Sequence, residues 1–170
     1  HQRQQYRAMM ADPNTRAQAA YGKMARPVSA ESGEVMEVKL TPEQEELAKR
    51  RAEIGELLDE RDYEASAERD LALVADYPDQ CLPKRQMMDV ANQLMRVGKY
   101  PQAAAAYENF LKHYPTDGEV EQVKLVLGII YAKYLDQYEA AQNHLRESLT
   151  RLTNADQIQQ ATHWLEEATA

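Results

Sequence analysis

The chain repeats itself at an interval of about 37 residues. Tyr63 and Tyr100 lie 37 residues apart, and Tyr138 follows Tyr100 after 38. The pairs Tyr77-Pro78 and Tyr114-Pro115 keep the interval of 37. Self-similarity at this period is typical of proteins that stack one small supersecondary unit many times. The repeat therefore constrains the fold more tightly than any local motif in the chain.

Each interval has the pattern of two helices joined by a short link. The first helix start is marked by Thr41 at the N-cap, Pro42 at the first helical position and Gln44 at the capping-box position. Further helices are predicted over about 63–77, 84–98, 101–114, 119–134, 138–152 and 154–169. The links are short, which favours antiparallel helical hairpins in an all-α fold.

The middle repeat has the most regular motif. Gly98 and Tyr100 form a glycine–x–tyrosine turn, Ala103 and then Tyr107 follow at intervals of three and four, and Pro115 closes the unit. In these residues the chain resembles the tetratricopeptide repeat family. The resemblance implies a right-handed α-solenoid of about three hairpins with a C-terminal capping helix. The matching positions of the other two repeats are Tyr63, Ser66, Leu73, Pro78, Leu127, Gly128, Tyr131, Tyr138, Ala141 and Leu145.

The charge divides the chain into two parts. Residues 1–40 carry six basic and four acidic side chains, whereas the remainder carries 14 basic and 24 acidic ones. We expect 1–40 to be a poorly structured arm or linker, or alternatively an arm whose arginines lie near anionic lipid headgroups. Residues 41–170 are expected to form the repeat domain. Its repeats are predicted at about 45–78, 83–115 and 118–153, and its capping helix at 154–169, with Trp164 buried.

Several kinds of chemistry are disfavoured by the residues present. The single cysteine excludes an internal disulfide and any multi-cysteine metal site, and no two histidines lie one helical turn apart. A net charge of −8 argues against nucleic acid as a partner. The longest apolar run, 125–132, is too short to span a membrane. We therefore expect no catalytic residue, no metal or cofactor, and no enzyme activity.

What remains is a surface for binding another protein. The family resemblance implies that the first helix of each hairpin lines a concave groove. Asn92 resembles the groove asparagine with which some family members hold a peptide backbone or a terminal carboxylate. The alternative is an ordinary solvated face with surface ion pairs. The residues expected to line the groove are Arg51, Arg85, Met88, Asn92, Met95, Arg96, Gln122, Leu125 and Lys133.

Two functions follow as hypotheses. The first is a non-catalytic scaffold that binds a peptide segment or a partner protein in the groove, expected in the cytoplasm. The second is a soluble regulatory or tethering domain of a larger bacterial membrane protein. It rests on residues 82–92 and 127–135, which are similar to helical-repeat tails of rhomboid-type intramembrane proteases. That resemblance implies catalytic residues outside this chain and a tether at the inner membrane.

Overall fold

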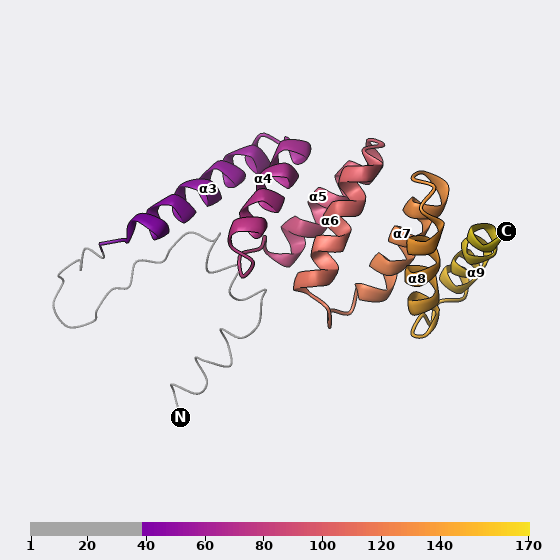
Figure 1. Ribbon diagram of the computed structural model, residues 1–170. Helices are drawn as coiled ribbons and strands as arrows, with labels where there is room; N and C mark the ends of the chain where they lie inside the picture. The colour runs from indigo at the N-terminus through magenta and orange to yellow at the C-terminus, as the bar shows by residue number, and fades with distance from the viewer. Residues whose placement is uncertain (1–38) are drawn as a thin grey trace, which may run out of the picture. The chain divides into compact units, whose positions relative to one another are not determined.

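The computed structural model describes residues 39–170, which form seven helices and no strand (Figure 1). No helix in this range has the length and apolar character needed to cross a bilayer. The expected arm, 1–40, lies outside the described residues except for positions 39 and 40. The helices are α3 (Pro42–Asp59), α4 (Tyr63–Asp76), α5 (Lys84–Arg96), α6 (Tyr100–His113), α7 (Val120–Lys133), α8 (Tyr138–Leu149) and α9 (Ala155–Thr169).

The sequence predicted these helices to within a few residues, and local chemistry explains several of their ends. At the start of α3, Gln44 N–H donates to the Thr41 hydroxyl and Thr41 N–H donates to the Gln44 side chain, so the capping box is formed. Asp62 and Asn154 accept backbone N–H groups at the starts of α4 and α9. Side-chain acceptors of this kind satisfy the donors that a helix N-terminus leaves unpaired.

The described residues divide into two compact units, with the boundary in the chain between Pro83 and Lys84. In the first unit α3 packs on α4, and Ile54, Leu73 and Val74 are among its buried side chains. In the second unit each helix from α5 to α9 packs on the next, and α9 also packs on α7. The grouping of 41–170 into one repeat domain stays a prediction.

The C-terminal helix covers α7 and α8. Ala161 and Ala168 of α9 belong to one buried cluster with Leu125, Ala132, Ala141 and Leu145. Leu125 was expected to line the groove, and this expectation was wrong because Leu125 is 3% exposed within that cluster. Trp164 packs against the same cluster but is only half-buried.

The three hairpin turns share one backbone feature. Arg61, Gly98 and Asp136 have positive φ angles of 60°, 78° and 52°, and each lies two residues before the tyrosine that begins the next helix. Their spacings are the same 37 and 38 residues as the sequence repeat. A left-handed residue after a helix turns the chain back on itself and is a common helix end. The repeat in the sequence is therefore also a repeat in local structure.

Small side chains occupy the same place in each hairpin. Ser66, Ala103 and Ala141 each lie three residues after a turn tyrosine, and all three are 0% exposed. Four residues further on, Tyr107 and Leu145 are 2% and 0% exposed. In the first hairpin the residue at this position is Asp70, which is 3% exposed.

Candidate binding surface on α5

Helix α5 has two chemically different faces. Arg85, Asn92 and Arg96 are exposed, and their spacings of seven and four residues place them nearly in line along the helix. The opposite face is buried and apolar. It consists of Met87, Val90, Ala91 and Leu94, all 2% exposed or less. Arg85, Asn92 and Arg96 were expected to line a groove, and that role stays a prediction.

Arg85 and Arg96 are flanked on α5 by two methionines and one aspartate. Met88 and Met95 lie half-buried beside the line of polar residues, and Asp89 is exposed on the same side. Among residues 39–170, neither Arg85 nor Arg96 forms an ion pair. The outward face of α5 therefore combines two available cations with flexible thioethers, which adapt to varied partner surfaces.

Asn92 is held by a side chain from the neighbouring helix. The Tyr107 hydroxyl of α6 donates a hydrogen bond to Asn92 Oδ1 at 2.5 Å. Tyr107 is 2% exposed, and burial raises its pKa to about 12. The phenol therefore stays protonated near neutral pH and remains a donor. The sequence placed Tyr107 only among the structural repeat positions, because helical periodicity does not reveal a contact between two helices.

Lys133 lies among aromatic rings at the end of α7. Its ammonium is 5.0 Å from the ring centroid of Tyr134 and 5.8 Å from that of Trp164. Tyr134 in turn stacks on Tyr100, with ring centroids 3.7 Å apart and planes 8° apart. Such cation–π contacts contribute about 0.5–1 kcal/mol each at exposed sites. The repeat pattern assigns Tyr134 no role, since this residue has no counterpart in the other repeats.

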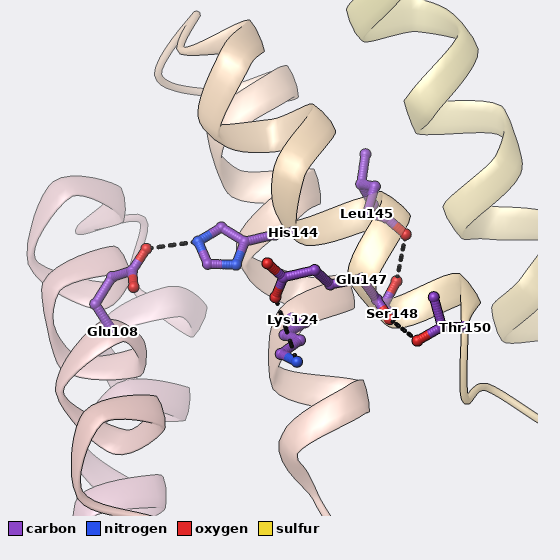
Figure 2. A network of polar contacts seen from close by, with 7 residues as sticks. All are labelled: Glu108, Lys124, His144, Leu145, Glu147, Ser148 and Thr150. Atoms are coloured by element: carbon purple, nitrogen blue, oxygen red, sulfur yellow. Dashed lines mark hydrogen bonds and ion pairs between the residues drawn. The ribbon is translucent and has the colours of Figure 1, made fainter. Parts of the chain in front are cut away.

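A second polar cluster joins α6, α7 and α8. His144 Nε2 lies 2.7 Å from Glu108 Oε1 (Figure 2), and the Tyr131 hydroxyl donates to the same oxygen at 2.9 Å. The bond with His144 lowers the pKa of Glu108. The Tyr131 and His144 rings also stack, with centroids 5.8 Å apart. His144 Nδ1 is buried and has no hydrogen-bond partner among the described residues.

The remaining predicted residues lie on other elements. Arg51 is half-buried on α3 in the first unit. Gln122 is exposed near the start of α7, eleven residues before Lys133, so the two lie on one side of that helix. The extension of the α5 surface to these three residues stays a prediction. Within the described range, no group of His, Cys, Asp or Glu side chains could hold a metal ion.

The chain matched no protein-family model, no curated protein and no solved structure. Its resemblance to tetratricopeptide repeats, and the weaker one to rhomboid-type tails, therefore rests on the residues given above. Both stay predictions.

Proposed function

We propose that this chain is a non-catalytic interaction module with the architecture of a right-handed tetratricopeptide-like solenoid, and that it binds a peptide segment of a partner protein. The observation that carries the proposal is the division of α5 into an apolar buried face and an exposed line of Arg85, Asn92 and Arg96. Arginines that form no ion pair within residues 39–170, flanked by half-buried methionines, are better suited to a partner than to internal packing.

The repeated turns support the solenoid part of this proposal. Left-handed residues recur at Arg61, Gly98 and Asp136, and fully buried small residues follow each turn at a constant offset. A stack of such hairpins lays its first helices side by side, which creates the extended concave surface that solenoids use for binding. Under this proposal α5 contributes its exposed face to that surface.

A peptide selection tests the binding function directly. A random 12-residue display library would be selected on the wild-type protein and on the variant Arg85→Glu/Asn92→Ala/Arg96→Glu. We expect sequences enriched on wild type to bind the variant at least tenfold more weakly in a titration with synthetic peptide, because three exposed contacts are lost. The matched control is Lys112→Glu/Arg151→Glu, which reverses two exposed charges on other segments and should bind as wild type does.

Two outcomes of this selection would contradict the proposal. Equal affinity of wild type and the α5 variant for every selected peptide would reject α5 as the binding surface. Equal losses in the α5 variant and the matched control would show that only overall charge matters, and this would also contradict the proposal.

A further inference from the structure

We propose that Tyr100 and Tyr134 form an oxidative cross-linking site, at which a one-electron oxidant joins the two rings into dityrosine. The bond would connect the start of α6 with the end of α7, and so link the hairpin of α5 and α6 to the hairpin of α7 and α8. This site is separate from the exposed face of α5, and it would be a modification site in addition to the proposed binding function.

The two tyrosine rings lie face to face. Their centroids are 3.7 Å apart and their planes differ by 8°. Aromatic pairs in proteins more often have centroids about 4.5–7 Å apart, because an offset is preferred. Here the centroid distance falls within the range of about 3.5–4.0 Å at which two carbon atoms are in optimal contact. The carbons of the Tyr100 ring therefore lie against those of the Tyr134 ring.

The phenolic ends of the two rings also meet. The Tyr134 oxygen accepts hydrogen bonds from the Lys133 ammonium and from the Tyr100 hydroxyl. The bond with Lys133 lowers the pKa of Tyr134, and the bond between the tyrosines raises the pKa of Tyr100. Because the two oxygens are neighbours, the ortho carbons beside them are neighbours as well. Those carbons carry unpaired spin in a phenoxyl radical, and they are the atoms that dityrosine joins.

The coupling balances with hydrogen peroxide as the oxidant and a haem peroxidase as the catalyst. One peroxide removes one electron and one proton from each phenol, and it leaves as two water molecules. The two radicals then form a carbon–carbon bond between their ortho carbons. The hydrogen on each of these carbons moves to the oxygen of its own ring, which restores both phenols. Lys133 favours the phenolate of Tyr134, and a phenolate loses an electron more readily than a phenol does.

Solvent exposure alone would select a different tyrosine. Tyr138 is 47% exposed and is the one tyrosine of residues 39–170 on the open surface, whereas Tyr100 and Tyr134 are half-buried. The Tyr138 hydroxyl donates to Asp136, and its ring belongs to none of the aromatic pairs of the described residues. A reaction governed by proximity should therefore link Tyr100 to Tyr134, whereas one governed by exposure should modify Tyr138.

The test is oxidation of the full chain at low protein concentration with a haem peroxidase and hydrogen peroxide. We expect dityrosine fluorescence in a product that runs as a monomer in a denaturing gel. Trypsin cleaves after Lys99 and Lys133, so tandem mass spectrometry should find peptides 100–112 and 134–146 joined through their first residues, with two hydrogens fewer than the separate peptides. Dityrosine in dimers alone, or a link confined to other tyrosines, would overturn the proposal.

Three variants test the assignment to this pair. Tyr100→Phe and Tyr134→Phe each keep a ring but remove a phenol, so each should lose the monomeric product. The matched control is Tyr138→Phe, because Tyr138 lies in the same tryptic peptide as Tyr134, and it should form the link as wild type does. Retention of the monomeric product in Tyr134→Phe, or its loss in Tyr138→Phe, would reject the pair.

The cross-link should also stabilise the fold. It closes a loop between residues that are 34 positions apart, and it restricts the unfolded chain as a disulfide does. Peroxide also oxidises methionine, so the reference is Tyr134→Phe treated in the same way. Treatment should shift the midpoint of thermal unfolding upward in wild type relative to its shift in Tyr134→Phe. Equal shifts in the two proteins would show that the link does not fit the folded arrangement, and would contradict the proposal.

Discussion

Gly128 of α7 lies directly against Leu145 of α8. A Cβ atom added at Gly128 would come within 2.5 Å of Leu145 Cδ2, a separation at which the two atoms overlap. Leu145 is 0% exposed and belongs to the cluster beneath α9, so it has little room to move. The close approach of these two helices therefore requires a residue without a side chain at position 128.

Gly128→Ala should destabilise the second unit. Alanine favours a helix over glycine by about 1 kcal/mol, but displacement of Leu145 in a packed core costs about 1–3 kcal/mol. We expect a net loss of stability in urea unfolding followed by circular dichroism. The control is Gly55→Ala in α3, where no atom lies within 4 Å of the new Cβ. It should gain up to about 1 kcal/mol, and a gain in both variants would contradict the contact.

The left-handed turns predict two substitutions with opposite effects. Gly98→Ala should cost about 1–2 kcal/mol, because φ of 78° is strained for a residue with a Cβ atom. Arg61→Gly should raise stability, since Arg61 has φ of 60° and its side chain is exposed. Thermal unfolding of the two variants checks this expectation. Loss of stability in both would show that the Arg61 side chain contributes more than its backbone strain costs.

Asp70 predicts a dependence of stability on pH. It is 3% exposed, and burial raises its pKa from 3.8 to about 7. The folded state therefore binds the proton more tightly than the unfolded state, so stability falls as pH rises from about 4 to 7. Asp70→Asn does not titrate, and its advantage over wild type should grow across that range to the order of 4 kcal/mol.

The measurement for Asp70 is chemical unfolding of both proteins at pH 4.5 and pH 7.5. Asp59→Asn is the matched control, because it makes the same substitution at an exposed aspartate of the same unit. A constant difference between wild type and Asp70→Asn at the two pH values would contradict the raised pKa.

Glu108 predicts a change of the opposite sign. Its pKa is lowered, chiefly by the hydrogen bond with His144. The stability that this carboxylate provides is therefore present above its unfolded pKa of 4.5 and is lost as pH falls through the lower folded value. Glu108→Gln should destabilise the protein at pH 6, and the difference should shrink by pH 3.5. The Glu108 side chain is 40% exposed, so we expect less than about 1 kcal/mol.

The control for Glu108 is another carboxylate of the same region. Glu147 pairs with Lys124 at 3.3 Å and is 60% exposed, so Glu147→Gln should change stability little at either pH. An effect of Glu108→Gln that is equal at pH 6 and pH 3.5 would show that packing, not charge, is responsible.

The buried carboxylate of Asp70 lies where the repeat pattern of the sequence and the packing of the structure differ. Asp70 occupies the position of Tyr107 and Leu145 in the other hairpins, yet the first repeat was matched through Leu73 instead. Leu73 is also buried, at 0% exposure. Leu73 was the expected core residue, because charged side chains are rarely fully buried. Asp70 lies seven residues after Tyr63, the same interval that separates Tyr107 from Tyr100 and Leu145 from Tyr138.

The sequence by itself determined the helices and their turns. Capping residues, prolines and the interval of about 37 residues act within a few positions along the chain, so their effects can be read locally. The resemblance to tetratricopeptide repeats implied that Arg85, Asn92 and Arg96 share one side of α5, and all three are exposed there.

Only the tertiary structure decided which side chains meet between helices. It paired Tyr107 with Asn92, stacked Tyr134 on Tyr100, and buried Leu125 in the cluster with α9. Helical periodicity assigns each residue a direction around its own axis, but contacts across helices depend on how the helices cross and which rotamers fit. For this reason the exposed face of α5 was predictable, whereas the orientation of Asn92 within it was not.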